Sequence, residues 1–389
     1  MRKRFYNYSL FVFLILILSN HTSAQTQIYE KTAEELYKNG LAAFQKSDFS
    51  VSVQFFSEAI KLLPNSPALY YYRGTALCQL SKFYEAIGDF DNSIKLHPDF
   101  AEAYDNRGLA YSTLGYFDLA VRDHSKAIEL KPNLANAYNN RGNALRGIRN
   151  FDSAIKDFNK ALELNPELAP TYLNRGTAYQ EKGDFEAALK DLNKAVSLLP
   201  NDWRVFANRG NTYVFLKKYD LALADLNKAL EMDKNPTLYY NRGRAFNEQG
   251  NFEAAIKDYS EAIKINPQYI DAYNNRGLIY KRVGKLDLAL EDFNKIISLN
   301  KADGIYYFNR GIVLLSKNQI EKSVNDFTKA IETYPKWAAA YKMRAEAYKK
   351  SGEVQLAKDD LSKANEFSKE NFNPVNATEL VTESLTKPN

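Results

Sequence analysis

The chain has 389 residues, of which 45% are hydrophobic and 25% are charged, and its formal net charge is +5. Without Arg2, Lys3 and Arg4 the balance is 49 basic against 47 acidic residues, and this near-neutral mixture gives no basic surface for nucleic acid. Cys78 is the only cysteine, so the chain cannot hold an internal disulfide.

The first 24 residues have the pattern of a secretory signal peptide. A basic start is followed by an apolar run from Leu10 to Leu18, and small residues end the segment at Ala24. The apolar run is too short to span a bilayer as a helix. The sequence therefore predicts an exported protein, periplasmic or secreted, with no integral membrane span after cleavage. The alternative is that the segment stays uncleaved and anchors the N-terminus in the membrane.

After a short polar lead at residues 25–32, the sequence repeats with a period of 34 residues. The triplet Asn-Arg-Gly recurs seven times at this spacing, apart from one step of 33. A fixed period of this size indicates a solenoid, in which each unit packs on its neighbours. The ten units are 33–66, 67–100, 101–134, 135–168, 169–202, 203–235, 236–269, 270–303, 304–337 and 338–371. Residues 372–389 are rich in polar groups, and we expect them to form a disordered tail.

Each unit shows a helical apolar period twice, with a break between the two stretches. In the unit at 135–168 we expect the first helix over about residues 136–146 and the second over about 151–164. Five units carry a glycine at the break, where a left-handed residue after a helix end is expected: Gly115, Gly183, Gly250, Gly284 and Gly352.

Close packing of the two helices requires small residues where they cross. Nine units have a glycine inside the first helix, such as Gly142, and its cost of about 1 kcal/mol relative to alanine implies a steric reason. Tyrosines of the first helices and phenylalanines of the second helices, such as Tyr138 and Phe158, are the expected core. His124 occupies the second-helix aromatic position of its unit and is expected to substitute there in the core.

Small residues at the eighth, twentieth and twenty-seventh positions, an aromatic residue at the fourth and a proline at the thirty-second resemble the tetratricopeptide repeat (TPR) family over residues 33–371. The resemblance implies an all-α fold, in which antiparallel helix pairs stack into a right-handed superhelical solenoid. It also implies that the first helices line a concave groove. Members of the family act mainly as scaffolds that hold peptides or partner proteins in that groove.

The seventh position, where the family usually has leucine, is arginine in nine units, and each of these units has an aspartate sixteen residues later. The first unit lacks both residues. The arginine lies about 60° around its helix from the aromatic residue, on the flank that faces the second helix. We therefore predict a partly buried, structural ion pair in each unit: Arg73–Asp89, Arg107–Asp123, Arg141–Asp157, Arg175–Asp191, Arg209–Asp225, Arg242–Asp258, Arg276–Asp292, Arg310–Asp326 and Arg344–Asp360.

The asparagine at the sixth position lies about 160° from the aromatic residue, so it is predicted to point into the groove. A side-chain amide has a donor and an acceptor, which suits it to bind a peptide backbone of any sequence. The series resembles the asparagine ladder of the O-linked N-acetylglucosamine transferase repeats. The candidate peptide-binding residues are Asn106, Asn140, Asn174, Asn208, Asn241, Asn275 and Asn309. The alternative is that these asparagines stabilise the junctions between repeats or reflect duplication.

The sequence offers no set of residues for catalysis. Histidine and cysteine do not cluster at metal-ligand spacings, and no glycine-rich phosphate loop follows a strand. We expect no enzyme activity, no cofactor and no metal. The predicted function is an exported repeat scaffold that binds protein or peptide partners in its groove. The alternative is a structural component of a cell-envelope assembly or polysaccharide-export complex.

Overall fold

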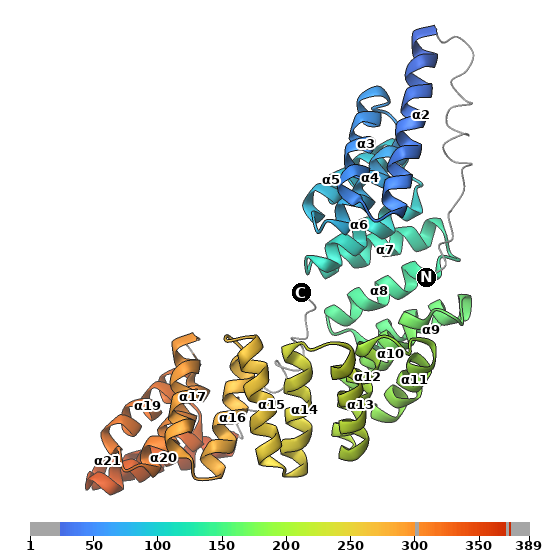
Figure 1. Ribbon diagram of the computed structural model, residues 1–389. Coiled ribbons are helices and arrows are strands. Elements are labelled where there is room, and N and C mark those ends of the chain that lie inside the picture. Colours follow the sequence, from blue (N-terminus) through green and yellow to red (C-terminus); the bar gives the residue numbers. More distant parts are fainter. Residues whose placement is uncertain (1–23, 300–302, 371–372, 375–389) are drawn as a thin grey trace. The chain divides into compact units, whose positions relative to one another are not determined.

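The computed structural model describes residues 24–299, 303–370 and 373–374 (Figure 1). All regular structure in these residues is helical, and successive helices pair through short turns. The expected all-α solenoid of helix pairs is thereby confirmed. Residues 1–23, which carry nearly all of the predicted signal peptide, and most of the predicted tail lie outside the described residues.

Contacts divide the chain into two units, Met1–Ala195 and Val196–Asn389, and each is described by itself. In the first unit a helix pair forms each repeat and packs on the next pair (Figure 1). Its helices are α2 (Ala24–Gln45), α3 (Phe49–Leu62), α4 (Pro67–Gln79), α5 (Phe83–Leu96), α6 (Ala101–Thr113), α7 (Phe117–Leu130), α8 (Ala135–Gly147), α9 (Phe151–Leu164), α10 (Ala169–Lys182) and α11 (Phe185–Leu198), the last of which runs across the unit boundary.

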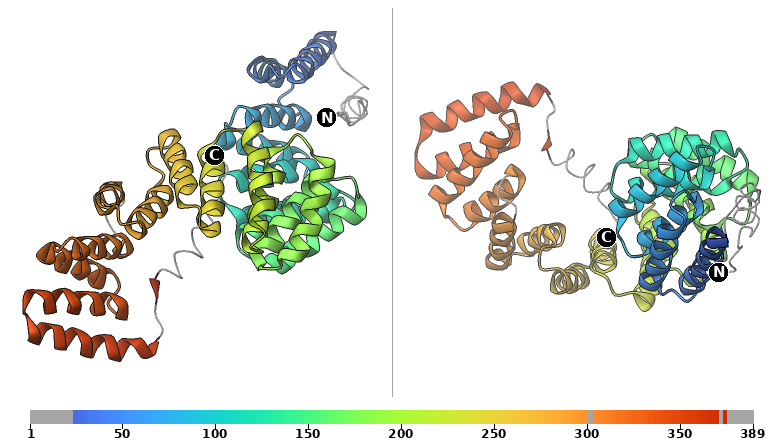
Figure 2. Two further views of the ribbon diagram at one scale, coloured as in Figure 1. Left: turned by 60° about the horizontal axis from the view of Figure 1, so that its bottom comes forward. Right: turned by 90° about the horizontal axis from the view of Figure 1, so that it is seen from above.

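The second unit repeats the same arrangement, and Figure 2 shows its pairs from two further directions. Its helices are α12 (Trp203–Phe215), α13 (Tyr219–Met232), α14 (Pro236–Gln249), α15 (Phe252–Ile265), α16 (Ile270–Arg282), α17 (Leu286–Leu299), α18 (Gly304–Ser316), α19 (Ile320–Thr333), α20 (Ala338–Ser351) and α21 (Val354–Phe367), followed by the short 3₁₀ helix η1 (Ser368–Glu370).

The helices of the unit at 135–168 lie where their apolar period predicts them. Helix α8 exceeds its expected span by one residue at each end, and α9 has the expected bounds. One difference occurs at the N-terminus of the fold, where α2 begins at Ala24. Residues 25–32, expected as a separate lead, therefore belong to the first helix of the first repeat.

The turn between paired helices requires a left-handed residue. The five predicted glycines adopt it, with φ between 77° and 89°. Five other turns place Ser47, Ser81, Arg149, Lys217 and Asn318 in the same conformation, with φ between 57° and 63°. Packing of the helix pair thus imposes the conformation on Ser47, Ser81, Arg149 and Lys217, which do not favour it.

In seven repeats a ring of the second helix lies in the core against a glycine of the first, and in the fifth and sixth repeats Leu192 and Leu226 take the place of the ring. The side chain of Phe158 is fully buried, and a Cβ at Gly142 would stand 2.6 Å from its Cε1 atom. Only glycine leaves room for the ring, which is the steric reason for glycine inside these helices. His124 is fully buried in the same way, as expected for a core substitute.

The first-helix tyrosines differ from the expectation. Tyr273 and Tyr341 are buried, but Tyr138 and five equivalent tyrosines are only partly buried: Tyr70, Tyr104, Tyr172, Tyr239 and Tyr307. Each of these rings lies under the guanidinium of the arginine three residues later, 5.4–5.8 Å from the ring centroid. They support the arginines and are not fully enclosed in the core.

Candidate functional site

The nine predicted ion pairs all form, and each joins the two helices of one repeat. In the fourth repeat, Arg141 Nε donates to Asp157 Oδ2 at 2.7 Å and Nη2 donates to Oδ1 at 2.8 Å. The other eight pairs have the same two-bond geometry, with distances of 2.6–2.9 Å. The planar guanidinium matches both carboxylate oxygens, so the pair fixes how the two helices sit together.

The same arginines also reach the preceding repeat, which the sequence reasoning missed. Arg141 Nη1 donates to Ser125 Oγ at 3.1 Å, and Ser125 follows the paired aspartate of the preceding repeat by two residues. Seven other arginines make this contact at 2.6–3.1 Å, to Ser57, Asp91, Asn159, Asn227, Ser260, Asn294 and Thr328. The sequence signal for this second contact is a polar residue two positions after each paired aspartate.

Burial and attraction act against each other in these pairs. At Asp89, desolvation raises the pKa of the carboxyl although the Arg73 guanidinium acts in the opposite direction. At Arg73, the hydrogen bond to Asp89 raises the pKa of the guanidinium although desolvation acts in the opposite direction. Each pair therefore combines a desolvation cost with the attraction of its partner, and it joins the two helices of its repeat.

Five of the seven predicted site residues lie between neighbouring first helices. Six of the seven are half-buried, and Asn241 is buried with 8% of its surface exposed. Five donate from Nδ2 to the first helix of the preceding repeat: Asn106 to Thr75 Oγ1 (3.2 Å), Asn140 to Asp105 (3.3 Å), Asn174 to Asn139 Oδ1 (3.0 Å), Asn275 to Tyr240 Oη (3.1 Å) and Asn309 to Asn274 Oδ1 (3.2 Å). Asn208 Nδ2 instead donates to the Arg204 carbonyl of its own helix, at 2.9 Å.

Four of these bonds join residues 35 positions apart, which matches the sixth position of one repeat to the fifth of the repeat before it. The match continues where the asparagine series stops. Tyr72 packs edge-on against Tyr37, with ring centroids 5.4 Å apart, and Met343 lies in one apolar cluster with Phe308. Five of the seven asparagines therefore make a polar bond across a repeat junction, so for these five a junction role is part of the structure.

The junction bonds use the donor side of the asparagine amides, and at two of these residues they leave the acceptor side without a partner in the described part of the chain. Neither Asn174 Oδ1 nor Asn309 Oδ1 has a hydrogen-bond partner among the described residues, and neither oxygen is buried. We call the side of the first helices that carries the seven asparagines the asparagine face. Leu109, on α6 one turn after Asn106, is an apolar side chain of this face that is 49% exposed.

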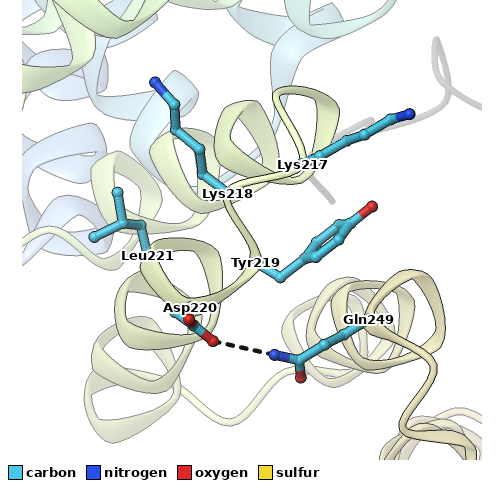
Figure 3. A pocket seen from close by; sticks show the side chains of 6 residues that line it. All are labelled: Lys217, Lys218, Tyr219, Asp220, Leu221 and Gln249. Atoms are coloured by element: carbon cyan, nitrogen blue, oxygen red, sulfur yellow. Dashed lines mark hydrogen bonds between the residues drawn. The ribbon is translucent and has the colours of Figure 1, made fainter.

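A separate hollow of about 320 Å³ lies in the second unit at the turn between α12 and α13. Lys217, Lys218 and Leu221 contribute to its wall, and Gln249 Nε2 donates to Asp220 Oδ1 at 3.1 Å across it (Figure 3). Its wall contains no histidine, cysteine or hydroxyl nucleophile beside a base. Over the described part of the chain, His, Cys, Asp and Glu form no group of three or more that could hold a metal. No described helix is long and apolar enough to cross a membrane.

Sequence models of one family match the chain in this register. Models described as tetratricopeptide repeat match residues 101–134, 135–168, 169–202, 203–236, 270–303 and 305–336, and a model described as TPR repeat matches 243–284. Together these segments cover more than half of the chain, and four have the bounds of the predicted units. No curated protein matches the chain.

Solved structures show the same kind of fold. A tetratricopeptide repeat protein from Parabacteroides merdae is 23% identical, with a TM-score of 0.52, over 67% of this chain and 99% of that protein. MamA is 30% identical over 42% of this chain and 96% of its own, with a TM-score of 0.39. YrrB, described as a TPR protein with an unusual peptide-binding site, is 27% identical over 47% of this chain and 95% of its own, with a TM-score of 0.40.

Proposed function

The chain belongs to the tetratricopeptide repeat family, and we propose that it is a non-enzymatic scaffold whose asparagine face binds an extended segment of a partner protein. The observation that carries this proposal is the one-sided use of the amides. At Asn174 and Asn309 the junction bond holds the asparagine by its nitrogen, and the carbonyl oxygen has no partner within the described residues and is open to a ligand.

An extended peptide suits such a face. Its main-chain N–H groups are donors at regular spacing, and an amide oxygen accepts from them whatever the side chains are. Neighbouring helices pack at roughly 8–10 Å, which is close to three residues of extended chain. Within one unit, successive asparagines can therefore contact one ligand chain. Because the junctions hold the side chains before binding, little rotamer entropy is lost on association.

The partner is proposed to meet the protein outside the cytoplasm. The basic start, short apolar run and small residues of the first 24 positions support export through a secretory signal, and the mature protein is then periplasmic or secreted. An envelope-assembly role, with contacts through the second helices, is the competing function, and the same experiment distinguishes the two.

The test is site-specific photo-crosslinking of the full-length protein expressed in its own cells. A photoreactive residue is placed at Leu109 or Asn136, which lie on the asparagine face, or at Asn92 or Asp118, which are exposed on second helices. We expect crosslinked partners from the first two positions and little from the other two. Crosslinks from Asn92 and Asp118 alone would reject the asparagine face as the binding surface and favour an assembly role.

A further inference from the structure

A continuous chain of side-chain hydrogen bonds crosses three repeats of the first unit. Asn174 Nδ2 donates to Asn139 Oδ1 at 3.0 Å, and Asn139 Nδ2 donates to Asn140 Oδ1 at 3.3 Å. Asn140 Nδ2 then donates to both oxygens of Asp105, at 3.3 Å each. The chain runs from α10 through α8 to α6, and every bond in it has the same direction.

The carboxylate at one end determines that direction. An ionised carboxylate can only accept, so Asn140 must turn its NH₂ group toward Asp105 and its oxygen toward Asn139. Asn139 must then donate to Asn140 and accept from Asn174. Two further donors agree with this order: His124 Nδ1 lies 2.7 Å from Asp105 Oδ1, and Thr171 Oγ1 donates to Asn139 Oδ1 at 3.0 Å.

We propose that Asp105 is a positioning residue that orients this amide chain, so that Asn174 presents its oxygen and the face takes a ligand that supplies an uncharged N–H, such as a main-chain amide. This inference rests on the proposed function, because it names the chemistry that the asparagine face selects. Asn174 is half-buried, and its oxygen is neither enclosed nor bonded within the described residues. It is therefore the free end of the chain.

Nearby charges are paired, which favours a neutral donor over a cation. Lys131 Nζ lies 2.7 Å from Glu102 Oε1, and Arg146 Nη1 lies 2.7 Å from Glu181 Oε1. Asp105 receives donors from both the Asn140 amide and the His124 ring. A ligand ammonium would thus find no unpaired carboxylate in this group, whereas an amide N–H needs only the oxygen of Asn174.

The second unit provides an internal contrast. Asn309 Nδ2 donates to Asn274 Oδ1 at 3.2 Å, in the same geometry as Asn174 with Asn139. Within the described residues, no carboxylate accepts a hydrogen bond from Asn274. The orientation of the amides there is set by the pair alone. In the first unit Asp105 fixes the direction of the amide hydrogen bonds, and the Asn274–Asn309 pair has no such carboxylate at its end in the part of the chain that the structure describes.

The orientation is tested by side-chain amide exchange in the full chain, labelled with ¹⁵N-asparagine and observed by NMR. In the unmodified protein we expect slowed exchange at Asn139, Asn140 and Asn174. Asp105→Asn removes the acceptor-only end, and exchange should then be about tenfold faster at all three amides, the effect of losing one hydrogen bond. Asp118→Asn, which removes an exposed charge from the same repeat, should change none of them.

A second variant keeps the test decisive if Asp105→Asn loosens the fold. Asn139→Ala cuts the chain in its middle, so exchange should accelerate at Asn174 and stay slow at Asn140. Acceleration confined to Asn140 in Asp105→Asn would show that the bonds act separately. Equal acceleration at Asn140 and Asn174 in Asn139→Ala would show that Asp105 does not hold Asn140 in place. Either result would overturn the proposal.

The ligand class is tested with three small probes. N-methylacetamide carries one amide N–H, N,N-dimethylacetamide carries none, and methylammonium carries a charged donor. We expect N-methylacetamide to shift the Asn174 side-chain resonance several times more than the other two at equal concentration. Equal shifts from both amides, or a response to methylammonium alone, would contradict the inference. This outcome is independent of the crosslinking result, so the two proposals fail separately.

Discussion

Asp157 accepts hydrogen bonds from Arg141 through both carboxylate oxygens, while the remaining nitrogen of the same guanidinium, Nη1, donates to Ser125 of the preceding repeat. One side chain therefore joins two helices of its own repeat and a third helix of its neighbour. The same contact recurs along the chain. The stacking of repeats is therefore specified by these arginine hydrogen bonds in addition to the apolar core.

Breaking one of these pairs from one side should cost more than removing it entirely. Asp157→Ala leaves the Arg141 charge, only 23% exposed, without its carboxylate, and we expect a loss of about 3–5 kcal/mol. The double variant Arg141→Met with Asp157→Leu should lose about 1 kcal/mol or less. Local unfolding free energies from hydrogen exchange in α8 and α9 measure both, because long repeat arrays need not unfold in two states. Lys160→Ala, at the exposed pair with Glu163, is the control. Equal losses for the single and double variants would contradict the account.

Replacing Lys217 by glycine should stabilise the turn between α12 and α13. A left-handed residue other than glycine costs roughly 1–2 kcal/mol, and the added chain entropy of glycine offsets part of this gain, so we expect about 0.5–1 kcal/mol. Asn318→Gly should gain less, because asparagine tolerates this conformation. Gly183→Ala should be destabilising. Thermal unfolding of the three variants measures the order, and a loss of stability in Lys217→Gly would refute the reasoning.

His124 and Asp105 should be strongly coupled. The Nε2 atom of His124 is buried without a partner among the described residues, so His124→Phe removes a buried polar atom that has no hydrogen bond. The same substitution takes the Nδ1 donor away from Asp105. We expect the double variant His124→Phe with Asp105→Leu to be more stable than either single variant, with a coupling energy of about 1 kcal/mol or more. A double-mutant cycle on the local unfolding free energies of α6 and α7, obtained from hydrogen exchange, determines it. Additive effects would mean that the 2.7 Å contact contributes nothing.

Cys78 should react slowly in the folded protein. Burial raises the pKa of its thiol to about 11, so the reactive thiolate is scarce at neutral pH. Relative to a thiol of ordinary pKa near 9, we expect about 100-fold slower alkylation by iodoacetamide at pH 7.5. Mass spectrometry of native and urea-unfolded samples gives the ratio. Similar rates in both states would show that the thiol is accessible.

Features that depend on one helix or one helix pair could be predicted from the sequence. Arg141 and Asp157 lie at fixed angles on two adjacent helices, and their joint repetition identified the pair. Gly183 and the other turn glycines were identified because only glycine adopts their conformation without strain. Lys217 adopts it as well, but its side chain gives no such signal, since the packing of the pair overrides its own preference.

Features that depend on stacking could not be predicted in the same way. The helical angle of Asn140 predicts a position away from the Tyr138 side of its helix, yet the angle does not show which residue of the preceding repeat it meets. That partner, Asp105, lies 35 residues earlier and becomes a neighbour only when the repeats stack. The acceptor of Arg141 Nη1 also lies in the preceding repeat and could not be predicted. Its residue type varies between repeats, so no single residue marks the position.

The central claim is that the asparagine oxygens bind the partner, and crosslinking yield from Leu109 tests it most directly. The yield is compared between the unmodified protein, the double variant Asn140→Ala with Asn174→Ala, and Asn92→Ala, which removes an exposed asparagine from α5. Circular dichroism confirms that each variant is folded. We predict about a tenfold lower yield for the double variant, as expected for the loss of hydrogen bonds to the ligand, and no change for Asn92→Ala. Equal yields from all three folded proteins would contradict the account.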